Sequence, residues 1–150
     1  MKTKVDRLVE ILLVEDNPKD EELALHALAM NRLANRIDVV HDGAEALDYL
    51  FCEGAYAGRS FRSNPGVILL DLKLPKVDGL AVLRIAKTDI RTRHIPVVVL
   101  TSSREESDLI ESYKLGVNSY IVKPVDFEQF SETVRLLGLY WVVLNERPSL

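Results

Sequence analysis

Apolar residues gather in short continuous runs that recur at intervals along the chain. These runs are rich in Val and Ile and carry no polar alternation, which is typical of strands buried on both faces of a parallel sheet covered by helices. Five runs have the length of a strand, and they occupy residues 11–14, 37–40, 67–70, 97–100 and 120–122.

Helical patterns with recognisable start signals separate the runs. Asn17 followed by Pro18 supplies a capping side chain and a preset backbone, so we expect a helix from there to about Arg32. Ser103 and Glu106 have the spacing of a capping box for a later helix. The other expectations are helices at 44–51, at 80–87 and from Asp126 onward, and an end of the Ser103 helix at Gly116.

Strand and helix alternate five times, which predicts an α/β fold. We expect a doubly wound sheet of five parallel strands with right-handed crossovers. A length of 150 residues suits a single domain. We place the core of that domain at about residues 8–145 of the chain.

Residues 52–66 form the one long connection between these elements. A length of fifteen residues is near the upper limit for a loop without secondary structure in a compact domain. A functional loop and a tolerated insertion both fit this length. Tyr56 and Phe61 within it suggest a contact with a partner.

Composition and charge exclude several classes of protein. The chain is 47% hydrophobic and 28% charged, as folded soluble domains are. A net charge of −4 without a dense basic run disfavours binding to nucleic acid or to an anionic membrane. No stretch has the length and apolarity of a membrane span or a signal peptide. Cys52 is the only cysteine, which excludes an internal disulfide and is compatible with a cytoplasmic location.

Polar residues that carry chemistry follow the predicted strands directly. In an open α/β sheet, ligands bind beyond the carboxyl ends of the strands. Two carboxylates about 4 Å apart repel each other by about 4 kcal/mol at an effective dielectric near 20, so converging acids call for a cation. Mg²⁺ suits an oxygen-only set better than zinc does, because no His or Cys belongs to it. The set comprises Glu15, Asp16, Asp71, Thr101, Ser102 and Lys123.

Asp71 is the candidate nucleophile, because a carboxylate can form an aspartyl-phosphate once a metal neutralises the incoming phosphoryl group. Lys123 would place a point charge on a phosphoryl oxygen, and Thr101 would donate a hydroxyl. Each residue also has a simpler interpretation: Asp16 as a helix cap, Thr101 as a turn former, Lys123 as a solvated side chain. Their joint position at the ends of strands of one fold favours a phosphoryl site.

Four segments, in this order, resemble the motifs of the response regulator receiver domain of two-component phosphorelay systems, a CheY-like family. They are ILLVEDNP, VILLDLKLPKVDG, IPVVVLTSS and NSYIVKP, and the resemblance covers about residues 11–144. It implies a flavodoxin-like strand order of 2-1-3-4-5. It also implies a signalling phosphoacceptor rather than an enzyme.

The resemblance assigns roles to particular residues. It implies that Asp71 accepts a phosphoryl group from a sensor histidine kinase, and that Glu15 and Asp16 complete an acidic pocket. Thr101 and Tyr120 would be switch residues that alter the face of the fourth helix, fifth strand and fifth helix, although spacing alone makes Tyr120 a core residue. Mg²⁺ would be bound by Asp16, Asp71 and the backbone carbonyl of Lys73, with Lys123 as the lysine of the pocket.

Two further features concern the kinase and the phosphoryl lifetime. With these motifs, the long 52–66 connection resembles regulators paired with bacterial and cyanobacterial phytochromes, so a phytochrome is a candidate kinase. Lys73 and Ser103 stand two places after Asp71 and Thr101, and their side chains are candidates for setting how long the phosphoryl group survives.

The last part of the sequence suggests how the protein passes its signal to other proteins. Only 27 residues follow Lys123, so we expect no attached output domain and an unknown downstream protein. The segment RLLGLYWVVLNE carries apolar residues nearly all round a helix, whereas packing on a sheet needs one stripe. The excess predicts a homodimer interface, with folding back onto the domain as the alternative. The interface residues would be Leu136, Tyr140, Trp141 and Val143.

Three other functions remain open from the sequence. A flavin carrier shares the fold, but the acidic segment EDNPKD would repel an FMN phosphate. A haloacid-dehalogenase-type phosphatase also uses an aspartyl nucleophile, usually with a second Asp two residues later, where this chain has Lys73. A receiver that binds partners without being phosphorylated is the third, and the intact set of Asp16, Asp71, Thr101 and Lys123 argues against it.

Overall fold

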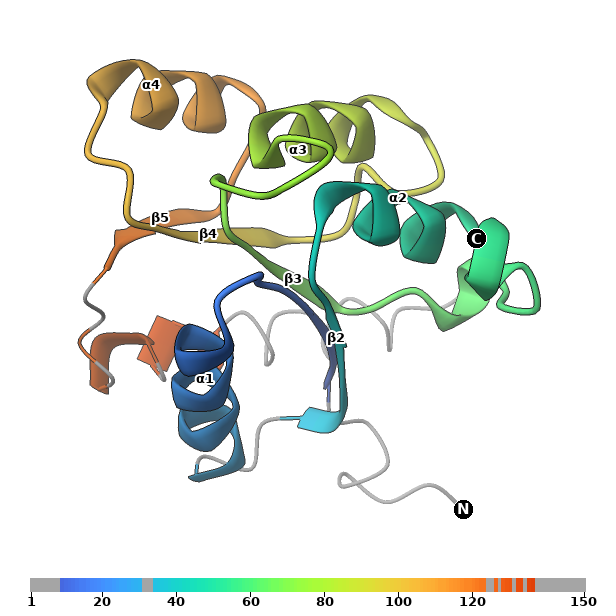
Figure 1. Ribbon diagram of the computed structural model, residues 1–150, viewed down its shortest axis with the longest axis horizontal. Helices are drawn as coiled ribbons and strands as arrows, with labels where there is room; N and C mark the ends of the chain where they lie inside the picture. Colours follow the sequence, from blue (N-terminus) through green and yellow to red (C-terminus); the bar gives the residue numbers. More distant parts are fainter. Residues whose placement is uncertain are drawn as a thin grey trace.

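The computed structural model describes residues 9–30, 34–123, 126, 128–130, 132–133 and 135–136. Five strands form one all-parallel sheet in the order β2-β1-β3-β4-β5 (Figure 1). This confirms the predicted doubly wound α/β fold and its strand order. The strands are β1 (Val9–Val14), β2 (Ala34–Val40), β3 (Val67–Leu70), β4 (Val97–Thr101) and β5 (Ser119–Val122).

The three central strands are buried on both faces, as expected. Every residue of β3 and β4 is buried, and so are residues 11–14 of β1. The strands pair in register, with Leu13 opposite Leu69 and Leu69 opposite Val98. The same expectation was wrong for the outer strands, where residues 37–39 of β2 and all of β5 are half-buried. Each outer strand has one neighbouring strand and is therefore less covered.

Side-chain caps begin three of the helices. Asn17 accepts hydrogen bonds from two N–H groups of the first turn at 2.9 and 3.2 Å, so α1 starts where the sequence predicts. Its predicted end at Arg32 lies outside the described residues. Asp42 and Asp78 cap α2 and α3 in the same way. The helices are α1 (Pro18–Met30), α2 (Gly43–Phe51), α3 (Gly79–Thr88) and α4 (Glu106–Lys114).

The capping box predicted for α4 is wrong. Its N-cap residue is Glu105, whose side chain makes no capping hydrogen bond. The hydroxyl of Ser103 instead donates to Asp108 at 2.5 Å, and its oxygen accepts the N–H of Glu105 at 3.3 Å. Ser103 therefore fastens the preceding loop to the helix. The expected end is present, because Gly116, with a φ of +92°, follows the helix.

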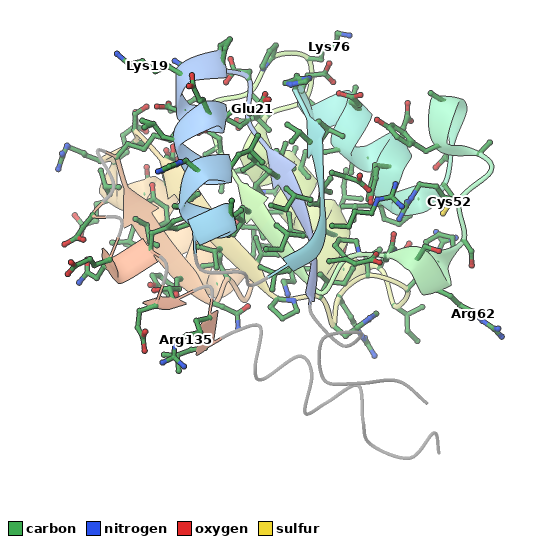
Figure 2. The ribbon with its side chains drawn as sticks, turned by 90° about the horizontal axis from the view of Figure 1, so that it is seen from below. Lys19, Glu21, Cys52, Arg62, Lys76 and Arg135 are labelled. Carbon is green, nitrogen blue, oxygen red and sulfur yellow. The ribbon has the colours of Figure 1, made fainter. Side chains whose placement is uncertain are left out.

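Helices cover both faces of the sheet. α1 lies on one face, and α2, α3 and α4 lie on the other (Figure 1). Phe130 packs with the α1 side of the core, and the described residues around it are helical at 128–130, 132–133 and 135–136. Figure 2 places Lys19 and Lys76 at the end of the molecule where the strands finish, and Arg62 at the opposite end. None of the helices within the described residues is long and apolar enough to cross a membrane.

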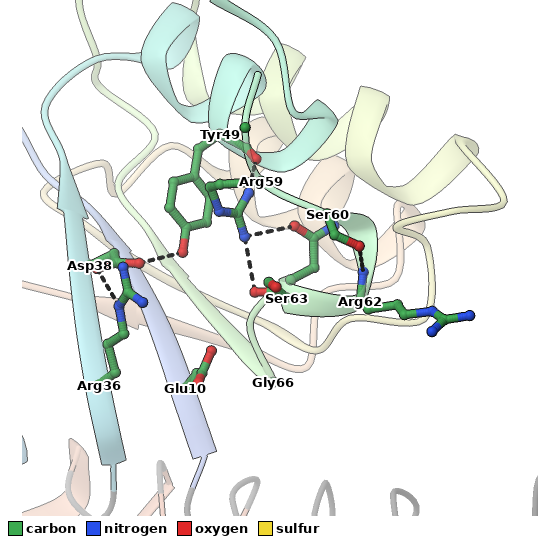
Figure 3. Close-up of a pocket in the computed structure, with 11 residues that line it drawn as sticks. Glu10, Arg36, Asp38, Tyr49, Arg59, Ser60, Arg62, Ser63 and Gly66 are labelled. Carbon is green, nitrogen blue, oxygen red and sulfur yellow. Dashed lines mark hydrogen bonds and ion pairs between the residues drawn. The ribbon is translucent and has the colours of Figure 1, made fainter. Parts of the chain in front are cut away.

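Contacts within the chain hold the 52–66 connection in place. The guanidinium of Arg59 stacks on the ring of Tyr49 at 3.6 Å (Figure 3), and that of Arg91 lies 4.6 Å from the ring of Phe61. The hydroxyl of Tyr56 donates to Glu45 of α2 at 2.9 Å. Both aromatic residues considered for a partner thus contact other parts of this chain. The connection also contains two 3-10 turns, Gly54–Tyr56 and Phe61–Ser63.

Candidate functional site

Three acidic side chains meet where β1 and β3 end. Glu15 and Asp16 follow β1, and Asp71 follows β3. One carboxylate oxygen from each lies within 4.8 Å of the other two. Glu15 and Asp71 are buried, whereas Asp16 is exposed, so the cluster is open to solvent on one side. An oxygen-only set of this kind fits a hard divalent cation.

The side chain of Lys123, which follows β5, forms ion pairs with two of these acids. Its ammonium nitrogen lies 2.6 Å from Glu15 and 3.1 Å from Asp71, and the side chain is only 14% exposed. A third hydrogen bond reaches Asp20 of α1 at 2.8 Å. Burial disfavours the charged ammonium, but the hydrogen bonds to Asp20 and Glu15, together with the charges of Asp71 and Glu15, outweigh it and raise the pKa of Lys123. The Lys123 side chain is therefore charged, and its ammonium is held between these carboxylates.

Asp20 is a member of this cluster that sequence reasoning missed. An acid in the first turn of a helix is expected simply to complement the helix dipole, so nothing local distinguishes it. The available signal was its place in the first turn of α1, close in sequence to Glu15 and Asp16 at the end of β1.

Burial dominates the electrostatics of Glu15. Burial raises the pKa of Glu15 to about 7, the hydrogen bond from Lys123 opposes this, and the charge of Asp71 adds to it. Three carboxylates, those of Glu15, Asp20 and Asp71, contact the Lys123 ammonium, and the carboxylate of Asp16 lies beside two of them. This excess of negative charge favours binding of a second cation.

The loop after β3 orients Asp71. Its Oδ1 accepts the N–H of Lys73 at 3.1 Å, while its Oδ2 accepts from Lys123. The N–H of Gly79 donates to the carbonyl of Leu72 at 3.0 Å, which closes the loop on itself. A Cβ at position 79 would lie 2.4 Å from the carbonyl oxygen of Asp71, so this approach requires glycine.

Thr101 and Tyr120 meet at the loop that leaves β4. Thr101 is fully buried, and its hydroxyl oxygen accepts the N–H of Ser103 at 3.2 Å. The hydroxyl of Tyr120 donates to the carbonyl of the same Ser103 at 3.2 Å. Tyr120 is half-buried against the core, and the N–H of Lys123 donates to the Thr101 carbonyl at 2.8 Å. The structure thus brings both predicted switch residues to the edge that carries Asp71.

Comparison with known families identifies this arrangement. The family model of the response regulator receiver domain matches residues 11–135, which is most of the chain. The chain belongs to the response regulator receiver family. All four motifs quoted from the sequence lie within the matched residues. The flavin carrier and the phosphatase belong to other families, so the comparison favours the receiver over both.

Curated relatives match this receiver over nearly its whole length. It is 46% identical, over 93% of its length, to the probable methanogenesis regulatory protein FilR2 of Methanothrix harundinacea, and covers 87% of that protein. It is 37% identical, again over 93% of its length, to the response regulator Rcp1 of Synechocystis sp., and covers 92% of it. Neither relative is much longer than the receiver itself.

Solved structures of response regulators superpose closely on the receiver. The bacteriophytochrome response regulator RtBRR is 57% identical with a TM-score of 0.79, over 94% of this chain and 84% of that one. The phosphorylated cyanobacterial phytochrome response regulator RcpA is 42% identical with a TM-score of 0.77, over 95% and 99%. The Mn²⁺-bound form of Rcp1 is 36% identical with a TM-score of 0.76, over 95% and 98%. Phytochrome response regulators are thus among its close homologues.

A separate pocket of about 620 Å³ lies beside the 52–66 connection, near the starts of β1 and β2 (Figure 3). β1, β2, α2 and the 52–66 connection line it. Its polar side chains bind one another: Arg36 pairs with Asp38 at 3.0 Å, and the Tyr49 hydroxyl donates to Asp38 at 2.5 Å. These contacts connect β2 to α2, and none of them reaches the acidic cluster.

The predicted dimer interface falls mostly outside the described residues. Leu136 is described and is 54% exposed. Tyr140, Trp141 and Val143 lie outside the described residues, so the interface stays a prediction.

Replacing Gly79 with Ala is expected to destabilise the receiver by about 1–3 kcal/mol, because the added methyl overlaps the backbone that carries Asp71. Urea unfolding measures the free energy of unfolding. Gly58→Ala is the matched control, since a Cβ there meets nothing within 4 Å. Equal losses of stability for the two variants would contradict the close approach at Gly79.

Proposed function

We propose that this receiver accepts a phosphoryl group on Asp71 from a histidine kinase in a Mg²⁺-dependent reaction. The observation that carries the proposal is the buried carboxylate of Asp71, which lies between the Lys123 ammonium and two further acids. A histidine kinase follows as the donor from membership of the receiver family of two-component systems.

The transfer exchanges one bond to phosphorus for another. A carboxylate oxygen of Asp71 attacks phosphorus, the bond from phosphorus to the donor atom breaks, and the donor keeps that electron pair. The product is an acyl phosphate on Asp71. The hydrogen bonds from Lys73 and Lys123 orient the carboxylate before the donor arrives, which lowers the entropic cost of the reaction.

The residues around Asp71 fit Mg²⁺. Asp16, Asp71 and the backbone carbonyl of Lys73 would hold the ion, and Glu15 lies in the same acidic set. When bound, Mg²⁺ neutralises charge on the phosphoryl oxygens and on the carboxylates. The Mn²⁺-bound form of Rcp1 supports a divalent cation in this receiver too.

Two side chains are positioned to stabilise the phosphorylated form. The ammonium of Lys123, 3.1 Å from Asp71, would bind one phosphoryl oxygen. The hydroxyl oxygen of Thr101 already accepts the N–H of Ser103, so its own proton is available for donation to a second oxygen.

The same contacts support a switch through Thr101 and Tyr120. Movement of Thr101 toward the phosphoryl group would carry Ser103 with it, because the two are hydrogen-bonded. Tyr120 would then lose its hydrogen bond to Ser103, and its ring would turn into the space that Thr101 leaves. A downstream protein would bind the altered face of α4, β5 and the fifth helix, where three apolar residues of α4 are exposed: Leu109, Ile110 and Tyr113.

A phytochrome as the kinase is the finer part of this proposal. It is supported by the similarity to RtBRR and RcpA, both of which are phytochrome response regulators. The cytoplasm, where ATP-dependent kinases work, is the compartment that this role requires.

A homodimer through the C-terminal segment is also proposed. Leu136 is exposed on the described part of the fifth helix. The sequence adds Tyr140 and Trp141 as aromatic anchors and Val143 beside them.

Incubation with acetyl phosphate and Mg²⁺ is expected to add one phosphoryl group to the wild-type receiver and none to Asp71→Asn. Intact mass spectrometry measures the addition, and EDTA is expected to prevent it. Glu106→Gln, which removes an exposed acid of α4, is the matched control and should be phosphorylated normally. No addition to the wild type, or an equal addition to Asp71→Asn, would overturn the proposed function.

Replacing Tyr140 and Trp141 together with Ala is expected to make the receiver monomeric, because it removes the largest apolar side chains of the proposed interface. Light scattering at micromolar concentration measures the molar mass. Tyr113→Ala, which alters an exposed aromatic residue of α4, should leave the dimer intact. A wild-type monomer in both phosphorylation states would refute the dimer.

A further inference from the structure

One carboxylate outside the acidic cluster is shared by donors from two loops. Asp108, in the first turn of α4, is buried, with 9% of its surface exposed. Its Oδ2 accepts the hydroxyl of Ser103 at 2.5 Å and lies 3.7 Å from the ammonium of Lys73. The loop after β3 and the loop after β4 therefore meet at this single oxygen.

Both donors are bonded directly to residues of the proposed phosphorylation site. The N–H of Lys73 donates to Asp71, and the N–H of Ser103 donates to Thr101. Asp108 thus completes a path of contacts from Asp71 through Lys73 and Ser103 to Thr101. No step of the proposed phosphoryl transfer uses Asp108.

The two lysines near Asp71 differ in their freedom to move. Lys123 is 14% exposed and has three carboxylate partners. Lys73 is 56% exposed, and its ammonium forms an ion pair with Asp108. A phosphoryl group on Asp71 would bring almost two negative charges next to Lys73 and would compete with Asp108 for its ammonium.

We propose that Asp108 is a positioning residue that draws the Lys73 ammonium away from the phosphoryl group on Asp71, and so sets how fast water removes that group. This inference rests on the proposed function. In the hydrolysis, the oxygen of water attacks phosphorus and the bond from phosphorus to the Asp71 oxygen breaks. Asp71 recovers its carboxylate with the electron pair, and both hydrogens of the water leave with the phosphate.

When the Lys73 ammonium is not paired with Asp108, it slows this hydrolysis. The ammonium beside the phosphoryl group occupies space through which water would approach phosphorus, so water reaches the phosphorus less often.

Asp108→Asn tests this role, because the amide oxygen still accepts the Ser103 hydroxyl while the charge that attracts Lys73 is lost. The hydrolysis rate is expected to fall about two- to fivefold, the range that a partly exposed ion pair carries. Lys73→Met is expected to hydrolyse faster than the wild type. Each protein is phosphorylated with acetyl phosphate, the donor is removed, and intact mass follows the decay in Mg²⁺.

The double variant separates positioning from a general structural effect. Because Asp108 acts through Lys73, Asp108→Asn should have no further effect in the Lys73→Met background. Glu106→Gln, which removes a charge from the same helical turn, should decay like the wild type. Circular dichroism checks the fold, and if Asp108→Asn does not fold, the rate of Lys73→Met alone tests the inference.

Two results would overturn the inference while the proposed function stands. One is a phosphorylated wild type whose decay rate neither Asp108→Asn nor Lys73→Met changes. The other is an equal slowing by Asp108→Asn with and without Lys73. A wild type that takes up no phosphoryl group would overturn the proposed function and this inference together.

Discussion

The ammonium of Lys123 is the contact on which the rest of the site depends. It is bonded to Glu15, Asp20 and Asp71, which come from separate segments of the chain. Glu15 and Asp71 are buried, and removing one partner of a buried ion pair typically costs about 3–5 kcal/mol. Lys123 therefore joins the end of β5 to β1, β3 and α1. It makes a cluster of acids compatible with a folded sheet.

The remaining features of the site follow from where these charges are held. The central strands are buried on both faces, so the residues that directly follow them have little room to move. The close approach of Gly79 restricts the backbone of Asp71 in the same way. Exposed Asp16 leaves the cluster open on one side, where a second cation and a phosphoryl donor would enter. A short path of hydrogen bonds through Ser103 then links Thr101 to Tyr120. The proposed switch needs no contact beyond this path.

Much of this arrangement was predictable because parallel strands end at one edge of the sheet. That rule alone places Asp16, Asp71, Thr101 and Lys123 together. The rule does not predict Asp20, because Asp20 lies in the first turn of a helix and not at the end of a strand. An acid in that position is already explained by the helix dipole. The sequence predicted Ser103 as the first residue of a capping box because Glu106 has the right spacing from it. The hydroxyl of Ser103 instead bonds to Asp108, and the spacing of acids after Ser103 does not distinguish these two arrangements. The burial of β2 and β5 was overestimated because apolar periodicity does not report a strand's place in the sheet.

Chemical trapping of the phosphorylated residue tests the central claim most directly. Borohydride reduces an aspartyl-phosphate to homoserine, so peptide mapping of the receiver after acetyl phosphate and borohydride locates the acceptor. We predict homoserine at position 71 only, in a Mg²⁺-dependent yield. Homoserine at the position of Asp16 or Asp20, or none in a protein that has gained a phosphoryl group, would contradict the account.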